Sequence, residues 1–200
     1  MPEKINVLSK DSCYQGFFNL DRVMLTHELY AGGMSQPISR EVLKMRRAVA
    51  VLLYDPVLDK LVMIEQFRIG AMDTEQGAWV LELVAGLVEA GEQDSDVAQR
   101  ESLEESGCEI SNLELIREYL VAPAATTERL AVYCARVDAS TAEGIHGVAE
   151  EGEDILVRVL TVEEAINELE GGKINSSCPI IAMQWFMQNR ERIHSEWLAN

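Results

Sequence analysis

The segment of residues 86–108, GLVEAGEQDSDVAQRESLEESGC, constrains the fold of this chain more than any other. Its residues 94–106 contain no Gly or Pro and consist mostly of good helix formers. Asp94 or Ser95 can cap the start of a helix there, and Gly107 can end it. Because short apolar runs of strand length flank this helix on both sides, we expect it to pack on a sheet.

Runs rich in Val, Ile and Leu predict strands at 48–54, 61–68 and 79–86 before the helix, and at 113–120, 130–137 and 154–160 after it. Thr161 and Glu164 predict a capping box for a second helix, which Gly171-Gly172 would end. Pro179, at a plausible first helical position, predicts the start of a last helix. This order argues for an α+β fold, an α/β/α sandwich, rather than a Rossmann fold.

Residues 1–47 are expected to form a separate small antiparallel sheet, and residues 48–200 the main domain. Runs 16–30 and 38–47 have the apolar alternation of half-buried strands, and the loop AGGMSQP between them suits a hairpin. Two or three strands rarely stand alone in water. This sheet therefore needs a partner surface, either the rest of the chain or a second subunit.

The composition indicates which kinds of binding partner and which cellular compartment are expected for this chain. With 17 basic and 34 acidic residues the formal net charge is −17, which disfavours nucleic-acid binding through a broad basic surface. No apolar run approaches the roughly 20 residues that a membrane helix needs, and the first residues, MPEKINVLSK, lack the apolar segment of a secretory signal. The four cysteines have no CxxC or zinc spacing, so we expect reduced thiols and a cytoplasmic protein; they are Cys13, Cys108, Cys134 and Cys178.

Three glutamates crowd one side of the predicted helix. With about 100° of rotation per residue, Glu101, Glu104 and Glu105 fall within a stripe roughly 100° wide. Like charges at this spacing destabilise a helix, and a divalent cation such as Mg²⁺ would remove that cost. Taken alone, such a run of charge is more often a solvated helix face.

The residues around these glutamates resemble the Nudix box, G-x5-E-x7-R-E-U-x-E-E-x-G-U, in all of its fixed letters. The matching residues are Gly86, Glu92, Arg100, Glu101, Glu104, Glu105 and Gly107. Ser102 departs from the usual apolar letter, but a serine is small and can bond its hydroxyl back to the carbonyl four residues earlier, so we expect the helix to form despite it. Cys108 fills the last apolar letter and is expected to pack in the core rather than act as a nucleophile.

The resemblance implies a Nudix fold with a mixed sheet, and hydrolysis of a nucleoside diphosphate linked to another group, with Mg²⁺ or Mn²⁺. It implies that Glu101 and Glu105 are the principal metal ligands, with Glu104 nearby and the backbone carbonyl of Ala85 as a further ligand. Glu92 and Arg100 match an ion pair that holds the loop to the helix.

Nearly the whole chain is similar to the bacterial ADP-ribose pyrophosphatase subfamily, through stretches such as YQGFFNL, IEQFR and GIHGVAEEGEDI. The resemblance implies a homodimer formed through the N-terminal sheet. Pro123 matches a subfamily proline, but Ala124-Ala125 replaces the two glycines that usually follow it. This departure leaves the substrate less firmly indicated than the type of reaction.

The loop at 143–154 is expected to supply the general base. The resemblance places that role on Glu151, with Glu153 as a further metal contact. The chemistry of the loop alone does not separate Glu150 from Glu151. An acidic, Gly-bearing loop could close the site, or it could be a plain solvated loop.

The resemblance also implies the contacts with substrate. Arg68 would lie beside the diphosphate, and Arg40 near the nucleotide, because a guanidinium suits phosphate recognition. Phe17 would stack on adenine and Glu128 would lie near the terminal ribose, although Phe17 could equally be a core aromatic. The three histidines have no metal spacing and are expected to be surface or core residues; they are His27, His146 and His194.

The expected activity is Mg²⁺-dependent hydrolysis of ADP-ribose to AMP and ribose 5-phosphate. Another nucleotide sugar such as GDP-mannose is the alternative substrate. A non-catalytic domain that senses ADP-ribose is the alternative of a different class. Such domains usually lose glutamates of the box, and this chain retains all of them.

Overall fold

A computed structural model of the chain describes residues 1–199, with the side chains of all of them except Glu151. The chain divides into two compact units. The first comprises Met1–Arg47 and Leu120–Arg129, and the second comprises the rest of the chain. The segment 120–129 joins the first unit because Leu43 N donates to Ala125 O (2.8 Å) and Thr127 N donates to Leu43 O (3.0 Å). The sequence instead predicts this segment as part of the main domain, residues 48–200.

The first unit is a three-stranded antiparallel sheet in the order β1-β2-β3, formed by β1 (Ile5–Gln15), β2 (Asn19–His27) and β3 (Ile38–Lys44). The predicted hairpin between the second and third of these strands is confirmed. The strand predicted at 16–30 is present as β2 but is shorter, because residues 16–18 form a bend that separates it from β1. The sequence did not indicate β1, since all of its residues are exposed and no apolar alternation marks it.

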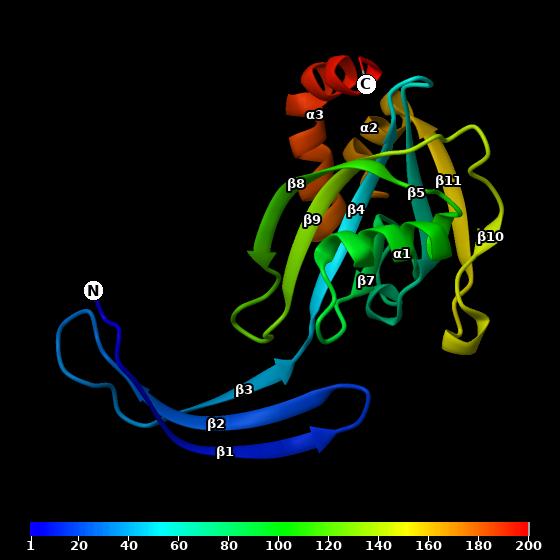
Figure 1. Ribbon diagram of the computed structural model, residues 1–200. Helices are drawn as coiled ribbons and strands as arrows, with labels where there is room; N and C mark the ends of the chain where they lie inside the picture. The colour runs from blue at the N-terminus through cyan, green and yellow to red at the C-terminus, as the bar shows by residue number, and fades with distance from the viewer. Residues whose placement is uncertain (200) are drawn as a thin grey trace. The chain divides into compact units, whose positions relative to one another are not determined.

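The second unit contains an eight-stranded sheet, with β10-β11-β5-β4-β9-β8 as its main order. β4 and β9 run in the same direction (Figure 1), whereas β4 and β5 are antiparallel, so the sheet is mixed. The strands are β4 (Arg47–Asp55), β5 (Lys60–Phe67), β6 (Trp79–Glu82), β7 (Val84–Leu87), β8 (Ser111–Leu120), β9 (Arg129–Arg136), β10 (Ile145–His146) and β11 (Ile155–Thr161).

The strand predicted at 79–86 is divided between two partners. β6 pairs with β5, placing Glu82 opposite Ile64, and β7 pairs with β4, placing Ala85 opposite Ala50. β4 and β5 pair with each other only at the end of β4, residues 53–55. Where they separate, β7 pairs with β4 and β6 pairs with β5. The arrangement brings Ala85 and Gly86 beneath the first helix, which packs against β7.

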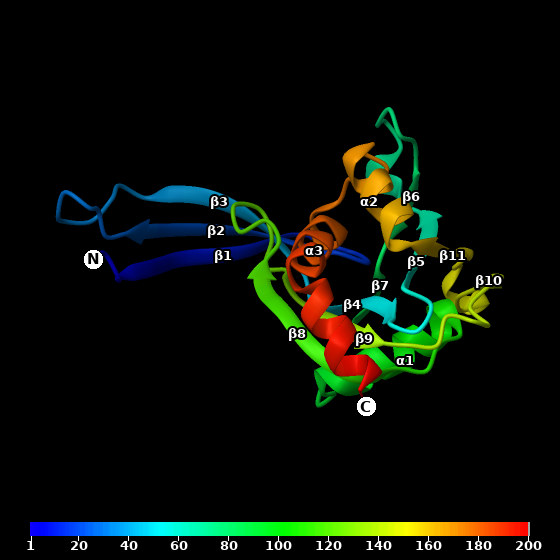
Figure 2. The same ribbon diagram turned by 90° about the horizontal axis from the view of Figure 1, so that it is seen from above.

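Helices cover both faces of this sheet (Figures 1 and 2). The long helices are α1 (Asp94–Ser106), α2 (Val162–Glu170) and α3 (Ser177–Leu198), and the short 3-10 helices are η1 (Ile69–Ala71) and η2 (Ala149–Glu151). α1 packs on one face, where Val97 and Ala98 join Val49 and Val51 of β4 in one apolar core. α2 and α3 lie on the other face.

Several predictions about the helices are confirmed and two are wrong. Helix 94–106 and the capping box of Thr161 with Glu164 are present as predicted. The N-cap of α1 is Gln93, with no side-chain cap, rather than Asp94 or Ser95. Pro179 is the third residue of α3 rather than its first, because the helix starts at Ser177. No helix in the described part of the chain is long and apolar enough to span a bilayer.

The C-terminal helix is held to the sheet by a polar network as well as by apolar packing. The ring of Tyr54 packs edge-on against Phe186 at 4.8 Å between centroids. The Tyr54 hydroxyl donates to Asp59 Oδ1 at 2.8 Å and lies 2.8 Å from His194 Nδ1. Arg190 of α3 pairs with Asp59. His194 is therefore a structural residue, as the sequence suggested.

Candidate active site

The absence of a side chain at Gly86 makes room for the Glu101 carboxylate. A Cβ added at Gly86 would lie 1.6 Å from Glu101 Oε1 and 2.0 Å from Glu101 Cδ, well inside contact distance. α1 therefore rests on β7 with this carboxylate directly over the backbone of Gly86. Any larger residue at this position has to displace Glu101.

One turn later on α1, Glu105 is almost completely buried. Only 3% of its surface is exposed, and its Oε2 accepts a hydrogen bond from Ala85 N at 2.9 Å. Burial raises the pKa of Glu105 to about 8, the Ala85 N–H opposes this rise, and the charges of Glu101 and Glu153 add to it. Burial therefore favours the protonated form of this side chain, and a nearby cation would favour the charged form.

Arg100 connects the loop before α1 to the acidic face of the helix. Its Nε lies 3.2 Å from Glu92 Oε1, and its Nη1 lies 2.6 Å from Glu101 Oε1 and 3.5 Å from Glu104 Oε2. Glu92 in turn accepts a hydrogen bond from Glu89 N at 3.0 Å, and this bond together with Arg100 lowers its pKa. The structure thus brings Glu92 and Arg100 together as the resemblance implied.

Arg68 follows β5 and reaches the same site. Its Nε donates to Glu82 Oε2 at 2.7 Å, and its charge lowers the pKa of Glu105, which is raised overall by burial. This hydrogen bond uses only Nε, and the terminal NH2 groups of an arginine are further donors suited to an anion. Sequence reasoning missed Glu82. A single carboxylate inside the apolar run WVLELVAG was the signal that could have indicated it.

The loop 143–154 brings a further carboxylate to α1. Glu153 Oε2 accepts a hydrogen bond from Val148 N at 2.8 Å, and its charge raises the pKa values of both Glu101 and Glu105, each of which is raised chiefly by burial. The side chain of Glu151, predicted as the general base, lies outside the described residues. Its backbone belongs to η2.

The donor set of this site suits a divalent cation. The buried Glu105 carboxylate has a neutral backbone N–H as its hydrogen-bond donor, and neighbouring carboxylates raise the pKa values of Glu101 and Glu105 further. Within the described part of the chain, no three acidic, His or Cys side chains are already arranged as ligands of one ion. Arg100 contacts Oε1 of Glu101, and a carboxylate has a second oxygen that can bind an ion.

The two departures from the box pattern both lie in the core. Cys108 is buried, burial raises the pKa of its thiol, and it packs in the core under α1 as expected. Ser102 is also buried, and α1 forms through it as expected, although its Oγ has no hydrogen-bond partner among the described residues. Its carbonyl instead accepts a bond from Ser106 Oγ at 2.6 Å.

Three predicted substrate residues belong to the first compact unit. Phe17 is 88% exposed and packs edge-on against Phe18, so it is not a core aromatic. Arg40 lies on β3 with Nη1 donating to Ser39 O at 2.8 Å. Glu128 is half-buried in the segment that pairs with β3, and its backbone N donates to Thr126 Oγ1 at 2.9 Å.

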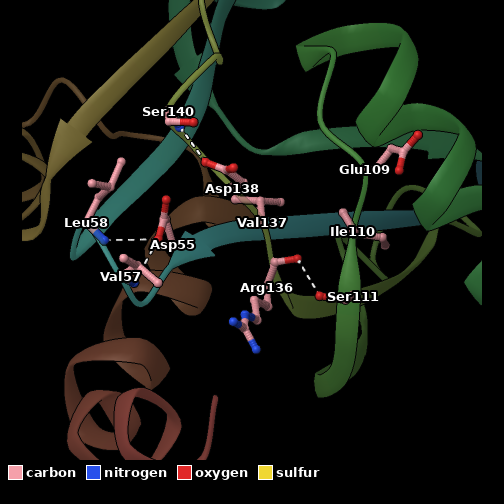
Figure 3. A pocket seen from close by; sticks show the side chains of 10 residues that line it. All are labelled: Asp55, Val57, Leu58, Glu109, Ile110, Ser111, Arg136, Val137, Asp138 and Ser140. Carbon is pink, nitrogen blue, oxygen red and sulfur yellow. Dashed lines mark hydrogen bonds between the residues drawn. The ribbon is translucent and has the colours of Figure 1, made fainter. Parts of the chain in front are cut away.

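A separate hollow of about 590 Å³ lies where β4, β9 and the segment after α1 meet (Figure 3). Asp55 in its wall is already satisfied, because its carboxylate accepts bonds from the backbone N–H groups of Val57, Leu58 and Ala139. Its lining, as far as the structure describes it, includes none of the predicted site residues. The carboxylates of α1 are therefore the better candidate for chemistry.

Comparisons with known proteins agree with this geometry. The sequence profile of the NUDIX domain matches residues 44–178. The chain is 40% identical to an ADP-ribose pyrophosphatase of Escherichia coli K12 over 96% of its length and 92% of the relative. It is 28% identical to a GDP-mannose pyrophosphatase of Pectobacterium atrosepticum, over 92% of this chain and 94% of the relative.

Among solved structures, a protein described as an ADP compounds hydrolase shares the fold. Its TM-score is 0.68 at 20% identity, and the match covers 94% of this chain and 96% of the other. The domain profile, the close relative and the glycine-bounded glutamates of α1 all lead to one assignment: the chain belongs to the NUDIX domain family.

Proposed function

We propose that this chain hydrolyses the diphosphate of ADP-ribose to AMP and ribose 5-phosphate, using Mg²⁺ and accepting Mn²⁺ in its place. The observation that carries the proposal is the group of carboxylates on α1, with the buried Glu105 at its centre. The substrate follows from the 40% identity with the ADP-ribose pyrophosphatase of Escherichia coli over nearly the whole chain.

Glu101, Glu104, Glu105 and the carbonyl of Ala85 hold the metal in this proposal, with Glu153 as a further contact. Mg²⁺ held by these residues would neutralise charge on the diphosphate and lower the pKa of a bound water molecule. An overall charge of −17 makes this neutralisation necessary for a negatively charged substrate to approach. Gly86 and Gly107 shape the two ends of the loop–helix unit, and the Glu92–Arg100 pair fastens it.

The remaining residues position the substrate and take up a proton. Arg68 donates hydrogen bonds to the diphosphate through its terminal NH2 groups. Glu151 accepts the proton of the attacking water, whose oxygen bonds to one phosphorus while the bridging P–O bond breaks. The released bridging oxygen leaves with the other phosphate, so the two products carry one phosphate each.

The first compact unit completes the proposal as a dimerisation sheet that also contributes Phe17, Arg40 and Glu128 to substrate binding. Large apolar side chains of β1, including Ile5, Val7 and Leu8, are exposed on a single chain, which supports a homodimer. The four cysteines are all free thiols, which supports the proposed reducing, cytoplasmic location.

The test is release of AMP from ADP-ribose with Mg²⁺, with and without EDTA. GDP-mannose is assayed beside it, because the 28% identical GDP-mannose pyrophosphatase makes that sugar the alternative substrate. Glu105→Gln removes the proposed ligand charge, and Glu163→Gln in the first turn of α2 is a matched control. We expect metal-dependent release from ADP-ribose that Glu105→Gln abolishes and Glu163→Gln leaves intact.

Each other result identifies a different function. Turnover of GDP-mannose alone would show that the chain hydrolyses a diphosphate as proposed, but with GDP-mannose rather than ADP-ribose as its substrate. Tight binding of ADP-ribose, measured by calorimetry, without turnover of either compound would refute catalysis and favour the sensor.

A further inference from the structure

His146 packs against the end of the helix that carries the site carboxylates. Gly107, the C-cap of α1, has φ +68, and a Cβ added there would lie 2.8 Å from His146 Cε1. On its other side, His146 Nε2 lies 2.9 Å from Glu143 O. The ring therefore fills the space above Gly107 and is held in place by the loop to which it belongs.

Gly147 and Val148, which follow His146, link the end of α1 to Glu153. Gly147 N donates to Glu104 O at 3.1 Å, so the loop is bonded to the backbone of α1 itself. Gly147 has φ +101, and a Cβ there would lie 2.7 Å from Glu153 Cβ. Val148 N donates to Glu153 Oε2 at 2.8 Å. Thus three successive residues connect the end of α1 to a carboxylate of the site.

The loop needs such an anchor because its acidic side chains are repelled by the carboxylates of α1. Residues 143–154, EGIHGVAEEGED, contain five acidic residues and neither Lys nor Arg. They approach a helix whose Glu101 and Glu105 have their pKa values raised, mainly by burial and in part by Glu153. Like charges at this range repel, and contacts that are independent of charge have to hold the loop against that repulsion.

We propose that His146 is a positioning residue, whose ring on Gly107 sets where the loop bearing Glu151 and Glu153 sits relative to the carboxylates of α1. The proposal rests on the proposed function of that loop. It assigns His146 no contact with substrate. Without the ring, the loop loses its packing on Gly107 and samples positions in which the base is misaligned.

The test compares His146→Ala with His146→Phe, which retains a ring over Gly107. His27→Ala is the control, because His27 also has a ring nitrogen, Nδ1, 2.9 Å from a backbone carbonyl but belongs to β2 of the other unit. Amide hydrogen exchange of residues 144–153 is measured in metal-free protein, and kcat and KM are measured separately for ADP-ribose hydrolysis.

We expect His146→Ala to speed exchange at Gly147 and Val148 and to lower kcat by about tenfold or more, since small misplacements of a catalytic group cost this much. KM should stay within about twofold, and His146→Phe should restore kcat and exchange protection to within about threefold of wild type. Unchanged exchange and kcat in His146→Ala would overturn the proposal. So would equal damage from both variants, which would indicate a general structural role.

The exchange measurement separates this proposal from the proposed function. If the wild-type protein hydrolyses no ADP-ribose but His146→Ala still speeds amide exchange at Gly147, the positioning role of His146 is supported and the assigned reaction is refuted. If the wild-type protein hydrolyses ADP-ribose but His146→Ala leaves amide exchange unchanged, the positioning role of His146 is refuted and the assigned reaction is supported.

Discussion

The buried carboxylate of Glu105 makes the stability of the metal-free protein depend on pH in a specific direction. Burial raises its pKa from 4.5 to about 8 in the folded protein. Below the unfolded pKa both states are protonated and the stability is fully present. As pH rises toward about 8, the unfolded chain loses this proton while the folded chain retains it, so the free energy of unfolding falls.

The size of this effect follows from the size of the shift. At about 1.4 kcal/mol per pH unit, a rise from 4.5 to about 8 corresponds to roughly 5 kcal/mol as an upper limit. Roughly 3 kcal/mol of it should be lost between pH 5.5 and pH 8. This range also keeps the protein away from its pI of about 4.5. Glu105→Gln resembles the protonated form and can still accept the Ala85 N–H bond.

Urea unfolding in EDTA at pH 5.5, 7 and 8 measures the effect. We expect the wild-type protein to lose about 3 kcal/mol across this range and Glu105→Gln to lose much less, so that the variant is the more stable protein at pH 8. Mg²⁺ added at pH 8 should restore stability to the wild type alone. Parallel pH profiles for the two proteins would refute the raised pKa assigned to Glu105.

Two further substitutions test the geometry around α1 and the end of the sheet. Gly86→Ala places a Cβ 1.6 Å from the present position of Glu101 Oε1, so we expect it to displace that carboxylate and lower Mg²⁺-dependent kcat by about 100-fold or more; ordinary activity in this variant would contradict the packing described. Thr161→Ala removes the capping box with Glu164, and thermal or urea unfolding should show a loss of about 1 kcal/mol with kcat unchanged.

Local sequence was sufficient wherever the determining contacts are local. The end of helix 94–106 could be predicted to the residue, because Gly107 ends it and no Gly or Pro interrupts it, whereas its N-cap, Gln93, was not predicted. The capping box at Thr161 depends on a residue only three positions away. The spacing of the acids and glycines also indicated the family of the chain and the helix that carries its chemistry.

Local sequence failed where the partner of a segment lies far away in the chain. β1 was missed because its residues are exposed on both faces, and pairing with β2, not burial, makes it a strand. The run 79–86 has the pattern of one strand. It forms two, β6 on β5 and β7 on β4, because β4 and β5 separate at this point in the sheet.

The sequence by itself thus determined which residues can do chemistry, through their type and their spacing along one helix. The tertiary structure decided their electrostatic state. Glu104 and Glu105 are adjacent acids in the sequence, yet of the two only Glu105 is buried, with a hydrogen bond from Ala85 N. That burial raises the pKa of Glu105 to about 8. Burial and the nearness of Glu153 come from contacts across the fold, and no local pattern contains them.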